Sequence, residues 1–190
     1  MVFACSPLRP ACAGDSCRLD LTGVIQLIAR WFCRDANRGM EYEEIIAGLQ
    51  ALQASDFDHW NAEARGWERL AELTDALIGT PRAEQAIPEL FSVMERLPDA
   101  VLGSPGPLVH TLERLHGYQD ELVRSVRRQP SLLSVWMVNR ILNTNLSDDA
   151  RRLYITLLNE ATKHPSASET VRHDARGFID FQMRKTPARL

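Results

Sequence analysis

The chain has 190 residues, of which 45% are hydrophobic and 25% charged, with a formal net charge of −3 and an isoelectric point near 6.0. This length is enough for a sizeable core, and the composition is typical of a soluble globular protein. The isoelectric point argues against direct nucleic-acid binding as the main role, and no apolar run approaches the roughly 20 residues of a membrane span.

Charge is distributed unevenly along the chain. Residues 1–100 contain nine arginines and sixteen acidic residues, a net charge of −7. Residues 101–190 contain thirteen basic and nine acidic residues, a net charge of +4. This asymmetry predicts an acidic half that can attract a basic partner.

Residues 1–19 form a leader rich in Cys and Pro, which we expect to be poorly ordered. Pro, Cys and Arg stand where a signal peptide would have an apolar segment, so the sequence predicts a cytoplasmic protein. Cys5, Cys12 and Cys17 follow a C-x6-C-x4-C spacing, which is not a zinc spacing, and are expected to be free thiols. Cys33 lies in a helical pattern and is expected to be a packed residue.

Apolar residues recur with a 3.6-residue period along residues 20–190, and no segment alternates as a half-buried strand would. The first predicted helix follows Asp20 and buries Trp31 and Phe32, and the second follows Gly39. We expect a single helical domain over these residues.

The third predicted helix begins at a cap supplied by Asp56 or Asp58, places Trp60 on its inner face and runs to Ile78. The fourth is expected to bury Leu90 and Phe91. Pro88 either begins this helix at its first position or kinks a longer one.

The stretch PDAVLGSPGP, residues 98–107, contains the strongest run of Pro and Gly in the chain. It predicts a linker between an acidic half, 20–97, and a basic half, 108–190. One long helix is expected to follow the linker and to end before Pro130.

Three further helices are expected, with caps at Ser131, at Ser147 or Asp148, and at Ser166 or Ser168. Their expected buried residues are Met137, Ile141, Leu157 and Phe178. The fold class is therefore all-α, with about eight amphipathic helices in antiparallel pairs. Both a compact helical bundle and a short HEAT-like α-solenoid fit this pattern.

The helix after Ser131 carries a narrow polar stripe of Trp136, Asn139, Arg140 and Asn143 on an otherwise apolar surface. Trp and Arg are enriched at interface hot spots, so the stripe is a candidate partner-binding site. A structural role for the stripe is favoured over partner binding. In that role the Asn side chains form hydrogen bonds with loop carbonyls, and Arg140 pairs with Asp148 or Asp149.

Two acidic clusters are further candidates. Asp56, Asp58, His59 and Glu63 combine carboxylates with an imidazole, but their spacing favours helix capping over metal binding or acid–base catalysis. The second cluster consists of Glu41, Glu43 and Glu44, at the start of a predicted helix. These residues are expected to form a solvent-exposed face of the helix, which can serve partner binding.

No established catalytic motif occurs: there is no GxSxG, HExxH, CxxC or Gly-rich phosphate loop. The five histidines have no partner at metal-ligand spacing, so no metal, cofactor or enzymatic activity is expected. Arg124 and Arg128 lie one turn apart and away from the core, which leaves a phosphate-binding patch as an alternative to a solvated face.

Three runs in the second half carry a resemblance: PSLLSVWMVNRILN, DDARRLYITLLNEA and SETVRHDARGFIDFQ. Together, over about residues 105–183, they resemble helical immunity proteins of bacterial polymorphic-toxin systems. The resemblance implies a cytoplasmic, HEAT-like protein that binds and blocks one cognate toxin, without catalysis.

An acidic binder suits a basic toxin, for instance one that acts on nucleic acid or nucleotides. The expected contact surface is the acidic half, through Glu41, Glu43, Glu44, Asp56 and Asp58, and the Trp136 stripe is the second choice. A helical-repeat adaptor in another pathway and an enzyme with an unrecognised site remain alternatives.

Overall fold

The computed structural model describes residues 40–58, 60–61, 63–103 and 105–185. Within them the chain is all-α without a strand, as the sequence predicts, and it contains eight α-helices and two 3-10 helices. The leader, the first predicted helix, Trp31, Phe32, the four cysteines and His59 lie outside the described residues. The elements are α2 (Tyr42–Ala51), η1 (Ala54–Phe57), α3 (Gly66–Ile78), η2 (Ala83–Ala86), α4 (Ile87–Arg96), α5 (Gly106–Arg114), α6 (Tyr118–Arg128), α7 (Leu132–Leu142), α8 (Asp148–Lys163) and α9 (Glu169–Lys185).

Several predicted helix starts are confirmed by their hydrogen bonds. The Ser131 hydroxyl accepts from the Ser134 N–H at 3.2 Å, and the Ser147 hydroxyl accepts from the Ala150 N–H at 3.2 Å. Pro88 is the second residue of α4, which follows η2 directly, so it lies in the first turn of this helix and not in its interior.

The predicted start of the third helix is wrong. The chain turns through η1 after α2, and α3 begins only at Gly66, which leaves Trp60 outside the helix and 95% exposed. Gly66 allows this entry, because a Cβ there would lie 2.5 Å from the Asp56 carbonyl oxygen. The periodic placement of Trp60 on an inner face therefore does not correspond to a helix.

The long helix predicted after the linker is also divided. Gly117 adopts φ 81°, a left-handed conformation that glycine tolerates best, and the chain reverses there between α5 and α6. Residues of the predicted linker, 98–107, contact the rest of the protein. Leu102 is buried in the core, and the Leu132 N–H donates to the Pro98 carbonyl at 3.3 Å.

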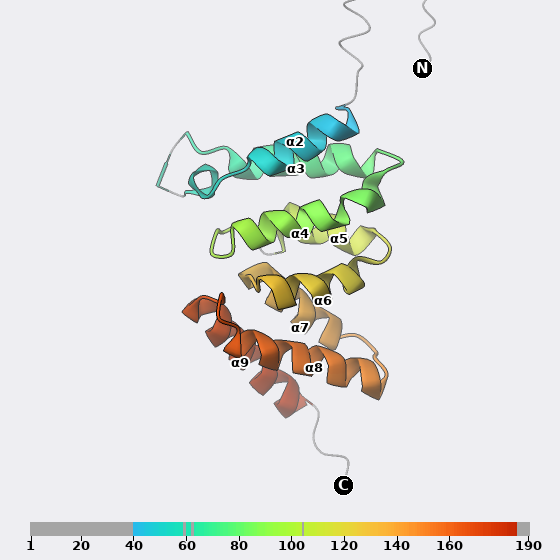
Figure 1. The fold of residues 1–190 in the computed structure, drawn as a ribbon, viewed down its shortest axis with the longest axis vertical. Helices are drawn as coiled ribbons and strands as arrows, with labels where there is room; N and C mark the ends of the chain where they lie inside the picture. The colour runs from blue at the N-terminus through green and yellow to red at the C-terminus, as the bar shows by residue number, and fades with distance from the viewer. Residues whose placement is uncertain (1–39, 59, 62, 104, 186–190) are drawn as a thin grey trace, which may run out of the picture. The chain divides into compact units, whose positions relative to one another are not determined.

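The helices within residues 40–185 pack as consecutive pairs: α2 with α3, α4 with α5, α6 with α7, and α8 with α9. The first members of the pairs, α2, α4, α6 and α8, follow one another in one layer, facing the viewer in Figure 1. The second members lie behind them, where α3 packs on α5 and α7 packs on α9.

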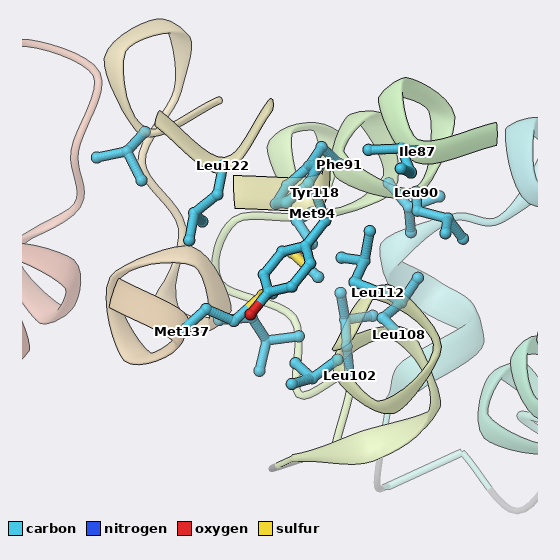
Figure 2. Close-up of a cluster of buried hydrophobic side chains, with 14 of the residues drawn as sticks. Ile87, Leu90, Phe91, Met94, Leu102, Leu108, Leu112, Tyr118, Leu122 and Met137 are labelled. Carbon is cyan, nitrogen blue, oxygen red and sulfur yellow. The ribbon is translucent and has the colours of Figure 1, made fainter. Parts of the chain in front are cut away.

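A continuous hydrophobic core runs between these layers. Figure 2 shows its centre, where Phe91 and Met94 of α4, Leu112 of α5, Leu122 of α6 and Met137 of α7 come together. The predicted burial of five residues is confirmed, namely Leu90, Phe91, Met137, Ile141 and Leu157.

Phe178 is only partly buried, so that prediction is wrong in degree. The fully buried residues of α9 are Val171, Ala175 and Gln182, and Phe178, which shares their face of the helix, packs against the core but stays partly exposed. The burial of a glutamine in place of a phenylalanine is the feature that the apolar periodicity could not predict.

Candidate partner-binding surfaces

The three glutamates at the start of α2 are exposed. The Glu44 carboxylate accepts from the Glu41 backbone N–H at 3.1 Å, which satisfies one of the donors that a helix start leaves free. Glu43 accepts from Arg82 Nη1 at 2.5 Å, and this hydrogen bond lowers the pKa of Glu43. Glu41, Glu43 and Glu44 thus have local roles and still present their carboxylates to solvent.

Asp56 and Asp58 hold the turns between α2 and α3. Asp56 accepts from the Gln53 N–H at 2.8 Å, and Asp58 accepts from the Trp60 N–H at 2.9 Å. Both contacts are typical of aspartate in turns, but neither residue caps α3 as predicted, because that helix begins at Gly66. No group of three potential metal ligands occurs among the described residues, and Glu63 is exposed.

Residues 40–99 contain thirteen acidic and four basic residues, a net charge of −9. Three of the four arginines are already engaged: Arg69 lies 3.6 Å from Glu72, Arg82 pairs with Glu43, and Arg96 donates to backbone carbonyls of α2. The acidic end of the molecule is defined by six exposed carboxylates on α3 and at the start of α2: Glu41, Glu43, Glu44, Glu68, Glu72 and Asp75.

Beside η1 stands an exposed aromatic residue that the sequence placed in the core. Trp60 is 95% exposed, and Val101, in the connection from α4 to α5, is 52% exposed. The two residues line one hollow. The signal available in the sequence was the run of polar and turn-forming residues around Trp60, which outweighs its helical spacing.

The stripe on α7 is tied to its neighbours through two separate sets of contacts. Arg140 donates from Nε and Nη2 to the two carboxylate oxygens of Glu113 on α5, at 2.6 and 2.9 Å. Its guanidinium carbon lies 4.8 Å from the centre of the half-buried Trp136 ring. The predicted pairing with Asp148 or Asp149 is wrong, and Asp149 instead pairs with Arg152.

The two asparagines of the stripe face α9. Gln182 Nε2 donates to Asn139 Oδ1 at 2.7 Å and to Asn143 Oδ1 at 3.1 Å, and Lys185 Nζ lies 2.9 Å from the same Asn143 oxygen. Their partners are therefore side chains of a neighbouring helix, and the predicted bonds to loop carbonyls are not formed.

The stripe also borders two shallow hollows, so its structural contacts leave part of it accessible. The hollow between α7 and α9 is lined by Asn139, Asn143, Phe178 and Phe181, and Phe181 is 44% exposed. The hollow on the other side is lined by residues of α5, α6 and α7, Arg140 and Asn143 among them.

The cluster of arginines on α6 is neutralised by carboxylates. Arg127 pairs with Glu160 of α8, and Arg128 pairs with both Glu95 of α4 and Glu121 of α6. Arg124 also pairs with Glu121. These ion pairs favour a structural role for the cluster over a phosphate-binding patch.

Compared with protein-family models, with curated proteins and with solved structures, the sequence and fold give no significant match. Among the described residues, no helix combines the length and the apolar character needed to span a membrane.

Proposed function

We propose that this protein is an immunity protein, which binds a cognate toxin and occludes it without modifying it chemically. In this proposal the paired helices are HEAT-like units stacked as a short α-solenoid. Supporting it are the succession of helix pairs and the continuous core between their two layers, an arrangement in which each unit buries its apolar face against the next.

The observation that carries the proposal is the acidic end. Its carboxylates lie on helices and remain exposed, and neither Glu68 nor Asp75 has an ion pair with a described residue. The negative electrostatic potential of these carboxylates raises the association rate with a basic protein and lowers it with an acidic protein. Toxins that act on nucleic acid need positive charge to bind their substrate, so they are the class of partner that the acidic end fits.

Polar contacts between successive pairs support a rigid binding surface. Gln50 of α2 donates to Glu89 of α4 at 3.2 Å, Arg128 of α6 binds Glu95 of α4 at 2.7 Å, and Arg127 of α6 binds Glu160 of α8 at 2.9 Å. A surface held in place before binding loses less conformational entropy when the partner docks.

A helical-repeat adaptor is the second candidate function. The observation that favours it is the hollow between α7 and α9, where Phe181 is exposed next to amide side chains, far along the chain from the acidic end. An adaptor that joins two proteins needs a second contact surface of this kind.

The test of the proposed function is co-expression with the products of the reading frames on either side of this gene, one of which is expected to encode the cognate toxin. We expect the protein to restore growth and to co-purify with the toxin as a stable complex. Toxicity that is unaffected by the protein, or the absence of a complex between the purified proteins, would contradict the proposal.

A further inference from the structure

Trp60 is the most exposed large hydrophobic residue that the structure describes, at 95%. Its backbone is part of a turn, in which the Trp60 N–H donates to the Asp58 carboxylate at 2.9 Å, and its indole ring is open to solvent. Tryptophan is enriched among the residues that contribute most at protein interfaces.

Beside Trp60 lies a hollow of about 470 Å³, between η1 and the connection from α4 to α5. Its floor includes the buried Phe57, and its wall includes Val101. Trp67 joins the two sides: its indole N–H donates to the Val101 carbonyl at 2.8 Å, and its ring meets Phe57 edge-on at 5.7 Å. The contacts of Trp67 with Val101 and Phe57 therefore hold the two sides of the hollow together.

The charged groups that line the hollow are Asp58, Asp99 and Arg96. Both aspartates are exposed, and Asp99 accepts from the Ser168 hydroxyl at 2.6 Å. The Arg96 guanidinium is already bound, because it donates to the carbonyls of Leu49 and Leu52 at 3.0 and 3.1 Å. The net charge of the lining is negative, within the segment of net charge −9.

We infer that this hollow receives an arginine side chain from the basic protein partner. Its apolar stem would lie against Val101 and Phe57, and its guanidinium would stack on the Trp60 ring and pair with Asp58. Tryptophan is the aromatic residue best suited to bind a cation, and guanidinium matches a carboxylate in two hydrogen bonds. The inference rests on the proposed function. It names the anchor of the complex, which is the partner's arginine side chain bound in the hollow beside Trp60.

The experiment titrates the full chain with an acetylated, amidated Gly-Gly-Arg-Gly-Gly peptide and follows the four tryptophan indole N–H resonances by NMR. The control peptide carries citrulline, which has nearly the same shape without the charge. We expect a saturable shift of the Trp60 indole at millimolar peptide, with binding by the citrulline peptide weaker by about fivefold or more. The spectrum of the Trp60→Ala variant assigns the resonance.

Three variants complete the test. Trp60→Ala is expected to abolish the response of the Val101 amide. Asp58→Asn is expected to weaken binding about threefold, because its side-chain oxygen can still accept from the Trp60 N–H while the charge is removed. Phe181→Ala, which removes an exposed aromatic side chain elsewhere, is expected to bind as wild type does. No saturable shift, or equal binding of both peptides, would overturn the inference.

The anchor and the proposed function can fail separately. If the purified toxin binds wild type and Trp60→Ala with equal affinity, the anchor is wrong and the immunity function stands. If the arginine peptide binds in the hollow and the toxin does not bind at all, the immunity function is wrong. A toxin affinity reduced tenfold or more by Trp60→Ala supports both.

Discussion

Gln182 of α9 donates from its side-chain amide to Asn139 of α7 at 2.7 Å, and only 1% of Gln182 is exposed. This contact explains why a helix that is apolar on most of its surface carries two asparagines one turn apart. Asn139 and Asn143 accept the two hydrogen bonds that the Gln182 amide nitrogen donates, and its carbonyl oxygen accepts from Arg151 Nη1 at 3.3 Å. The primary role of this part of the stripe is to seat the last helix of the chain's core.

The Gln182→Ala substitution is expected to lower the free energy of unfolding by about 1–3 kcal/mol, because it removes a buried side chain together with its hydrogen bonds to Asn139, Asn143 and Arg151. Urea unfolding followed by circular dichroism measures the change. The matched control is Gln119→Ala, at an exposed position of α6, which should stay within about 0.5 kcal/mol of wild type. Equal stability of the two variants would contradict the role of the contact.

The Trp136→Ala substitution separates the structural role of the stripe from a binding role. The ring is half-buried against the core and supports the Arg140 guanidinium, so we expect a loss of about 1–3 kcal/mol in thermal or urea unfolding. Trp60→Ala is the control at an exposed tryptophan and should leave stability nearly unchanged. If Trp136→Ala kept full stability and lost toxin binding, the stripe would be a binding site instead.

Phe91 and Phe178 differ in burial, so their substitution by alanine should lower the free energy of unfolding by different amounts. Phe91 is fully buried between α4 and its neighbours, so Phe91→Ala is expected to cost about 3–5 kcal/mol of stability. Phe178 is only partly buried, and Phe178→Ala should therefore cost clearly less, about 1–2 kcal/mol. A larger loss at Phe178 than at Phe91 would show that the inner face of α9 is assigned wrongly.

Glu121 links stability to pH. Burial raises the pKa of this carboxyl, but the hydrogen bonds from Arg124 and Arg128 outweigh it, so that the net effect is a pKa below the ordinary value. Because the folded state holds the proton less tightly than the unfolded state, stability falls as the pH drops below about 4.3. Urea unfolding at several acidic pH values should show a shallower loss for Glu121→Gln, and an identical pH profile would contradict this assignment.

The fold class follows from the apolar period, but several boundaries depend on backbone contacts that no period encodes. The break at Gly117 interrupts an apolar repeat that continues on both sides, so the sequence predicts one helix where two are present. The start of α3 depends on the close approach of Gly66 to the Asp56 carbonyl, a contact between segments ten residues apart.

The partners of the stripe could not be predicted for a related reason. Asp148 and Asp149 are near Arg140 in sequence, whereas Glu113 is 27 residues away and reaches Arg140 only because α5 and α7 lie in the same layer. Capping serines, by contrast, contact residues within three positions, and their roles were predicted correctly from sequence alone.

The central claim is that the acidic end attracts a basic toxin, and the most direct measurement is the association rate at several ionic strengths. The test variant combines Glu41→Gln, Glu43→Gln and Glu44→Gln. Reversal to Lys would also disturb the start of α2, whereas Gln removes the three charges and can still accept the capping hydrogen bond. The control removes three exposed acidic charges from the basic half, at Asp149, Glu169 and Asp180.

Stopped-flow mixing with the cognate toxin found by the co-expression test supplies the rates. We predict that the α2 variant associates about tenfold more slowly than wild type at low salt, that the difference shrinks as salt is added, and that the control does not associate more slowly. An unchanged association rate for the α2 variant at low salt would contradict the claim.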